Sequence, residues 1–390
     1  MILSHDFVSS WTCPSTREVI EFLLSRPKGT QPSKSIVIIN ELRPIDLYCY
    51  FSARFGAANG VQNLHRNDHS DNLIHWDWTL SCEYGYLAFW GGNFRTDVWL
   101  LGKFPFDDLA KDELIAKIRE DFFNYGKEMS EVRKQLEHWT EFVNPYWRLK
   151  RSIDQLLKEV NALDLDSTYG ERVHSPLSLA NNAQDWHALT ARYNKAFGLC
   201  FGVRSMLPVL AEAFVNLLIF LLVRSDIRKD QRLYDNIVRQ PIDVRIKSLH
   251  INCVGFERPV DYANDACRRY HSLVNERNDL LHGNVSPEKQ SFNEVCFMGN
   301  VPIFREYRSL WQRTIAVDSE AVGIPRLHAE VATVEAFTAY LKSCLTTKNQ
   351  EMVCIVIKKR DLARNHENGR FGILFPDHLI DSAVSKNEDQ

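Results

Sequence analysis

An almost wholly apolar stretch of eighteen residues, Met206–Val223, constrains the fold of the 390-residue chain more than any other feature. This length is at the short limit of a membrane span, and the stretch contains Glu212 and Asn216, which membrane helices rarely carry. Arg204 and Arg224 flank its two ends, so neither end has the excess of positive charge that orients a membrane helix. We therefore predict a helix buried in a helical bundle, and no membrane association.

A second stretch, Val260–Gly283, has the pattern of an amphipathic helix. Asp261 is placed to cap its beginning, and Gly283 is placed to end it. Apolar side chains recur at steps of three and four residues, which puts them on one face of a helix. They are Tyr262, Ala266, Tyr270, Leu273, Val274, Leu280 and Leu281.

The last turns of this predicted helix carry residues that suit chemistry on a phosphate group. Arg277 has a permanently charged, forked guanidinium, and His282 has an imidazole that exchanges protons near neutral pH. Asn278 lies one turn before His282 and shares its face. The alternative is structural: Arg277 pairs with Glu276 or Asp279, and His282 caps its own helix end.

The segment from Arg277 to Gly283, RNDLLHG, resembles the R-x4–6-H motif of HEPN domains. The helix at 206–223, with Glu212 and Asn216, resembles the first long helix of these domains. The same spacing of arginine and histidine occurs elsewhere, but only the 277–282 copy combines an asparagine, an amphipathic helix and a glycine stop. The other copies are Arg133…His138, Arg245…His250 and Arg360…His366.

The resemblance covers roughly residues 185–345 and implies a helical bundle that forms a homodimer through its HEPN-like helices. It implies a metal-independent endoribonuclease without a cofactor, which cleaves RNA at a composite dimer site and serves in anti-phage defence or as a toxin. Arg277, Asn278 and His282 would then be catalytic, with Glu212, Asn216 and Asp279 supporting them. Some HEPN domains do not cleave RNA, so the alternative function is a dimerisation or nucleotide-binding protein.

Basic residues near the motif are candidates for binding the RNA backbone. Residues 224–247 carry seven Arg or Lys against four Asp, and two arginines precede the motif. The alternative is a solvated helix face. We expect RNA contacts at Arg245, Lys247, Arg268 and Arg269.

The nine cysteines contain no CxxC pair, which argues against a zinc ribbon and favours reduced thiols in a cytoplasmic protein. His65, His69 and His75 stand near Asp68, Asp71 and Asp77, a mixture that is also typical of polar loops. We predict no metal site there, and we expect a regulatory partner or ligand at the N-terminal domain.

The whole chain reads as α+β, with an N-terminal α/β domain and a C-terminal helical bundle. In the N-terminal part, a strand at 35–40 and a helix at 44–55 precede an antiparallel meander over 73–101. The expected divisions are an α/β domain at 1–106, a helical arm at 107–162, a linker at 163–184, an HEPN-like bundle at 185–345 and an extension at 346–390. We expect an inserted hairpin at 291–304 and a strand at 352–357.

Overall fold

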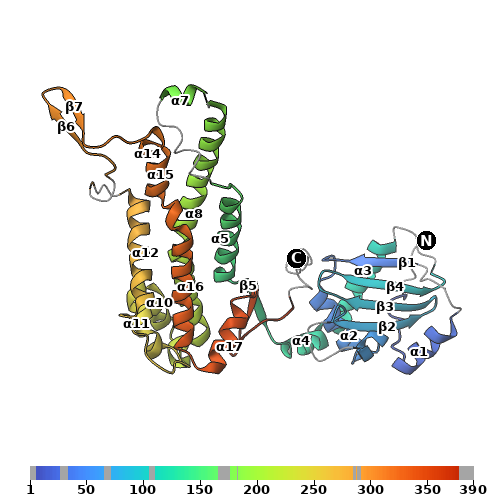
Figure 1. The fold of residues 1–390 in the computed structure, drawn as a ribbon. Coiled ribbons are helices and arrows are strands. Elements are labelled where there is room, and N and C mark those ends of the chain that lie inside the picture. The colour runs from blue at the N-terminus through green and yellow to red at the C-terminus, as the bar shows by residue number, and fades with distance from the viewer. Residues whose placement is uncertain are drawn as a thin grey trace. The chain divides into compact units, whose positions relative to one another are not determined.

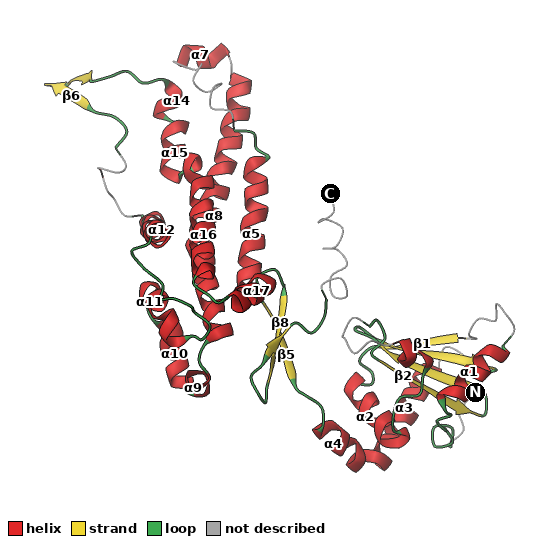
Figure 2. Ribbon diagram, turned by 60° about the horizontal axis from the view of Figure 1, so that its bottom comes forward, coloured by secondary structure: helices red, strands yellow, loops and turns green. Residues whose placement is uncertain are grey.

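The computed structural model describes residues 6–26, 34–65, 72–104, 110–165, 176–181, 183–283, 287 and 291–376. The chain forms two compact units, Met1–Glu141 with Ala363–Gln390, and Phe142–Leu362 (Figure 1). Strands dominate the middle of the first unit, and helices make up most of the second (Figure 2). The α+β class and the N-terminal and C-terminal placement of strands and helices are therefore confirmed.

The first unit is built on a four-stranded antiparallel sheet. Its strand order is β1-β4-β3-β2, from β1 (Lys34–Ile38), β2 (Trp76–Cys82), β3 (Gly85–Gly91) and β4 (Thr96–Gly102). Trp78 and Phe89, which pair across β2 and β3, pack with Phe51 in a core that also takes residues from helix α2 (Pro44–Phe55). Helix α1 (Thr16–Ser25) begins with a capping box between Ser15 and Glu18. The predicted meander and the helix at 44–55 are confirmed.

The predicted helical arm at 107–162 is wrong as a single element. Its first helices, α3 (Ala110–Phe122) and α4 (Gly126–Lys134), bury Ile118 and Met129 in the core of the first unit. Helix α5 (Pro145–Asn161) instead packs along the second unit. The boundary between the units falls inside β5 (Trp139–Val143), which forms a small sheet with β8 (Asp361–Asn365) and β9 (Phe371–Gly372).

One long helix, α8 (Ala183–Leu222), is the centre of the second unit. The predicted helix at 206–223 is only its C-terminal part, and Pro208 removes one backbone hydrogen bond without ending the helix. Among the described residues, α8 is the helix long and apolar enough to cross a membrane. Most of its apolar residues are buried by neighbouring helices, as expected for a bundle core.

The helices around α8 complete the bundle. They are α11 (Ile242–Asn252), α12 (Asp265–His282), α15 (Ile315–Val322) and α16 (Leu327–Ser343), together with α5. Shorter helices connect them: α7 (Pro176–Asn181), α9 (Ser225–Lys229), α10 (Gln231–Arg239) and α14 (Leu310–Arg313). Half of the predicted linker at 163–184, residues 166–175 and 182, lies outside the described residues, and α7 occupies part of the rest.

Two predictions beyond the bundle had opposite outcomes. The hairpin expected at 291–304 is present as β6 (Val295–Met298) and β7 (Val301–Phe304), joined by a turn in which Gly299 has a φ of 61°. The strand expected at 352–357 is wrong, because these residues belong mostly to helix α17 (Thr347–Val356). The Thr346 side chain accepts a hydrogen bond from the Asn349 N–H and so starts a helix that the β-branched composition had obscured.

Candidate active site

The predicted C-terminal end of α12 is confirmed, and the predicted N-cap is wrong. Gly283 follows the last helical residue with a φ of 60°, and its N–H donates to the Asp279 carbonyl, as expected for a glycine stop. The N-cap is Asn264, whose side chain accepts from the Ala266 N–H, and not Asp261. Asp261 precedes the helix and instead accepts the Ala263 N–H. The helix therefore starts later than predicted and ends at His282.

The buried stripe of α12 runs into the motif at Arg277. Cys267, Tyr270 and Leu273 are buried, and Arg277 follows Leu273 by four residues, on the same stripe. Arg277 is half-buried, and its Nε atom is buried without a hydrogen-bond partner in the described part of the chain. The sequence alternative, an ion pair of Arg277 with Glu276 or Asp279, is not recorded among the described residues.

The other two proposed catalytic side chains lie at the rim of the bundle. Asn278 is half-buried and His282 is exposed, and the four-residue step between them puts both on one side of α12. The motif therefore offers a cation set into the bundle surface and an imidazole open to solvent. No hydrogen bond joins Arg277 to His282 within the described residues, so a ligand between them would have to complete the arrangement.

The predicted support of the motif by Glu212 and Asn216 takes a different form. Arg245 of α11 donates from Nη2 to Glu212 Oε1 and from Nη1 to Asn216 Oδ1, both at 2.5 Å. The sequence left two roles open for Glu212 and Asn216, holding Arg277 or His282 in place and fixing the packing of the bundle, and this contact with Arg245 matches the second. The Arg245 side chain is only 7% exposed, so the expectation that it binds RNA at the surface is also wrong.

Tyr270 connects this cluster to the motif. Burial raises the pKa of the Tyr270 hydroxyl, the negative charge of Glu212 raises it further, and the charges of Arg245 and Arg277 oppose the change. All three charged groups therefore act on one hydroxyl, which donates to the Pro208 carbonyl at 3.5 Å. The Tyr270 ring stacks on Phe337 of α16, with 4.2 Å between centroids. The sequence had marked Tyr270 only as part of the apolar stripe.

A second buried arginine, Arg204 of α8, holds the last turns of α12 in place. Its Nε donates to Glu330 Oε2 of α16 at 2.7 Å, and its Nη2 donates to Glu276 Oε2 of α12 at 3.2 Å. Its Nη1 donates to the Val322 carbonyl at the end of α15. The sequence reading had missed this role, because Arg204 stands beside the apolar stretch and looked like a solvent-exposed flank.

A polar cavity of about 1180 Å³ adjoins the motif. Glu276, Asp279 and Leu280 of α12 form part of its wall, so Asp279 faces this cavity from within the motif. The opposite walls come from α15 and from the segments at both ends of the β6–β7 hairpin, with Arg305 and Arg308 among them. The cavity could hold a polar group the size of a nucleotide beside the candidate catalytic residues.

The remaining basic candidates lie on the helix surface. Lys247 pairs with Asp243 and sits 4.6 Å from the centre of the Tyr262 ring, and Arg269 pairs with Asp265. Arg268 is exposed. The positions of Lys247, Arg268 and Arg269 neither confirm nor contradict the predicted RNA contacts.

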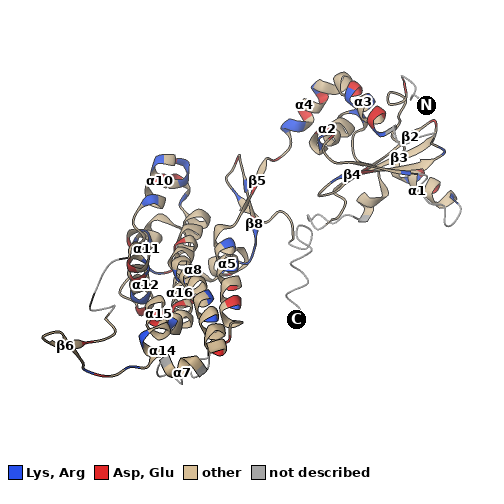
Figure 3. Cartoon of the chain, turned by 90° about the horizontal axis from the view of Figure 1, so that it is seen from above, with Lys and Arg blue, Asp and Glu red and all other residues tan. Residues whose placement is uncertain are grey.

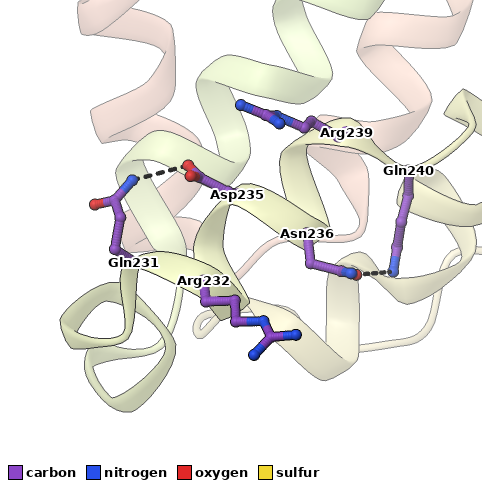
Figure 4. A pocket seen from close by; sticks show the side chains of 6 residues that line it. All are labelled: Gln231, Arg232, Asp235, Asn236, Arg239 and Gln240. Carbon is purple, nitrogen blue, oxygen red and sulfur yellow. Dashed lines mark hydrogen bonds between the residues drawn. The ribbon is translucent and has the colours of Figure 1, made fainter.

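Two further basic residues, Arg232 and Arg239, lie on α10, which carries blue segments in Figure 3. Its polar side chains border a second pocket of about 620 Å³ (Figure 4). In that pocket Asp235 accepts a hydrogen bond from Gln231, and Asn236 accepts one from Gln240, while Arg232 and Arg239 extend from the same helix.

The histidine-rich segment of the first unit provides little chemistry in the described residues. His69, Asp68 and Asp71 lie outside them. His75 contacts the Asn93 side chain and the Phe375 ring, and Asp77 is buried in the sheet. Within the described ranges no three His, Cys, Asp or Glu side chains come together as metal ligands would.

No protein-family model matches the chain, and neither the curated proteins nor the solved structures contain a significant match to it.

Proposed function

We propose that the helical unit is a metal-independent endoribonuclease of the HEPN type, which acts as a cytoplasmic homodimer. The observation that carries this proposal is the state of Arg277. It is half-buried at the end of α12 with its Nε unpartnered in the described part of the chain, while the carboxylate of Glu212, whose charge acts on the same Tyr270 hydroxyl, is bound by Arg245. A cation that keeps its charge available beside an exposed histidine is suited to binding a phosphodiester.

The proposed reaction is attack by the ribose 2′-oxygen on the adjacent phosphorus. A base removes the 2′-hydroxyl proton, the bond from phosphorus to the 5′-oxygen breaks, and an acid gives a proton to that leaving oxygen. The products are a 2′,3′-cyclic phosphate and a 5′-hydroxyl. His282 can serve as base or as acid, and two copies facing each other in a dimer would supply one of each. Arg277 would stabilise the charge on the five-coordinate phosphorus, and Asn278 would orient the phosphate.

The test is cleavage of labelled single-stranded RNA by the purified full-length protein in excess chelator. His282→Ala and Arg277→Ala should each reduce the rate at least 100-fold. His271→Ala is the matched control, because His271 is an exposed histidine of the same helix that contacts the Tyr262 hydroxyl and has no proposed role in cleavage. Thermal unfolding and mass measurements must show that the variants stay folded and keep their oligomeric state. Cleavage that persists in both variants would reject the proposed site.

One observation favours a second candidate, a nucleotide-binding protein that does not cleave RNA. The cavity beside the motif is large, and Arg305 and Arg326 are among the four arginines and five carboxylates that line it. Calorimetric titration with nucleoside mono- and triphosphates separates the two functions. Binding of a free nucleotide that Arg326→Ala weakens, without any RNA cleavage, would favour this alternative over the nuclease.

A further inference from the structure

The β6–β7 hairpin carries apolar side chains on both of its faces. The register pairs Val295 with Phe304, Cys296 with Ile303, Phe297 with Pro302 and Met298 with Val301. Paired residues point to the same side, so Val295, Phe297, Pro302 and Phe304 form one face, and Cys296, Met298, Val301 and Ile303 form the other. Neither strand contains a charged residue. A hairpin in contact with water normally has one polar face, and this one has none.

Almost all of this apolar surface is uncovered. Phe297, Met298, Val301 and Ile303 are between 50 and 74% exposed. In the described structure the two strands pair with each other and form a sheet of their own. A two-stranded hairpin alone in water is marginally stable at best, so this one needs a surface to pack on.

The base of the hairpin is attached beside the motif. Phe304 packs on Tyr307, and the Arg313 guanidinium of α14 lies 5.4 Å from the centre of the Phe304 ring. The residues that lead into and out of the hairpin line the same cavity as Asp279 and Leu280. The hairpin therefore projects from the end of the bundle that carries Arg277 and His282.

Exposed apolar side chains also lie on the two helices that lead to this end of the bundle. Phe201 and Val209 are exposed and lie two turns apart on one face of α8, with Phe201 nearer this end, and Leu281 is exposed at the end of α12. The contacts of Arg204 with Glu276 and of Tyr270 with Pro208 show that α8 and α12 run antiparallel. Phe201 and Leu281 consequently lie toward the same end.

We propose that the hairpin is a dimerisation arm that packs on the Phe201–Val209–Leu281 surface of a second copy of the chain. One copy offers both an apolar arm and an apolar surface, and a two-fold pairing would cover both at once. At about 100 Å² for each half-exposed large side chain, an arm offers roughly 500 Å². At the same rate the three residues of each surface offer roughly 300 Å², so two arms and two surfaces would bury roughly 1,600 Å², the standard size of a specific interface.

This inference extends the homodimer of the proposed function, but it does not depend on RNA cleavage. The molar mass in solution tests it without any substrate. A dimer that needs the arm and cuts no RNA would reject the nuclease and keep the arm. A protein that cuts RNA and stays dimeric without the arm would keep the nuclease and reject the arm.

The first experiment measures mass by size exclusion with light scattering over a range of protein concentrations. The wild-type chain should be a dimer, and Phe297→Ser with Ile303→Ser, one change on each face, should weaken dimerisation at least 100-fold. Both side chains are exposed in the single chain, so the substitutions should leave its fold intact. Phe94→Ser with Phe123→Ser, two equally exposed phenylalanines of the first unit, should leave the mass unchanged. A monomeric wild type, or a double variant that stays dimeric, would overturn the proposal.

The second experiment locates the arm with a short bismaleimide linker. Cys296 is the exposed cysteine among the described ones, which makes it the reactive end. A copy carrying Val209→Cys and Cys296→Ser, mixed with wild-type chain, should give a crosslinked heterodimer. Crosslinks that form only between two Cys296 thiols would show that the arms pair with each other and would overturn docking on the bundle. Arm-dependent flotation of a monomer with lipid vesicles would overturn it in favour of a membrane.

Discussion

Arg245 and Glu212 form an ion pair that spans α11 and α8 at 2.5 Å, and the charges of both act on the Tyr270 hydroxyl together with that of the motif arginine, Arg277. Glu212 is partly exposed and Arg245 is buried, so the arginine is held by the bundle and the carboxylate is turned toward it. Because Arg245 neutralises Glu212, loss of Arg245 would leave an unpaired carboxylate whose charge acts on the same hydroxyl as Arg277.

Replacing Arg245 should therefore impair the site through Glu212. Arg245→Met leaves Glu212 without its partner, and we expect a loss of about 2–3 kcal/mol in unfolding free energy and at least a tenfold slower RNA cleavage. Adding Glu212→Gln removes the freed charge and should recover most of the cleavage rate. Urea unfolding and cleavage assays on the single and double variants measure both effects. If the double variant is no faster than Arg245→Met, the pair has only a structural role.

The glycine that ends α12 offers a test of the assigned helix end. Gly283 has a φ of 60° and open space where a Cβ would be, so the cost of Gly283→Ala comes from the backbone alone, about 1 kcal/mol. Gly198 also has open space around it but lies inside α8, where Gly198→Ala should stabilise by about 0.5–1 kcal/mol. Thermal unfolding of the two variants should shift in opposite directions. A shift in the same direction would contradict the assigned helix end.

The fold was predictable wherever local chemistry decided it. The meander follows from alternating side chains and tight turns, and the limits of α2 follow from Pro44 and Gly56. Long-range packing decided the remainder. Nothing in the segment 107–162 shows that α3 and α4 cover the sheet while α5 covers α8, since all three have an amphipathic pattern.

In the candidate site, too, the features of a single helix were predictable and the contacts between helices were not. The spacing of Arg277, Asn278 and His282 on one helix end was readable, because it depends on a single element. The partner of Glu212 was not, because Arg245 lies on another helix and their contact depends on how α8 and α11 pack. Arg245 and His250 have the same spacing as the motif, but this copy was not chosen as the site because no glycine stop follows it.

Arg204 should be the most sensitive single residue of the helical unit. Arg204→Met leaves Glu330 buried and unpaired, and we expect a loss of about 3–5 kcal/mol in unfolding free energy. Glu276→Gln removes the other ion pair, but Glu276 is half-exposed, and the expected loss is below about 1 kcal/mol. Chemical denaturation of both variants gives the comparison. Equal effects would show that the Arg204–Glu330 contact is not the dominant one.

The first unit should lose stability as the pH rises, because of Asp77. Burial raises the pKa of its carboxyl to about 6, although the Gln62 N–H and the Trp90 side chain donate to it and oppose the change. Folding therefore favours the protonated form. The contribution is full below the unfolded value of 3.8 and is lost as the pH rises through about 6. The loss amounts to about 3 kcal/mol at neutral pH.

Asp77→Asn keeps the shape of the side chain without its charge, so it should stabilise the first unit at pH 8 and have little effect at pH 4. Other carboxyls also make the stability depend on pH: a hydrogen bond from the Lys111 ammonium, for example, lowers the pKa of Glu41 from 4.5 to about 2. The informative quantity is therefore the difference in melting temperature between variant and wild type at each pH. That difference should grow between pH 4 and pH 6 and then stay constant. A difference that does not change with pH would show that Asp77 is ionised in the folded protein at no cost.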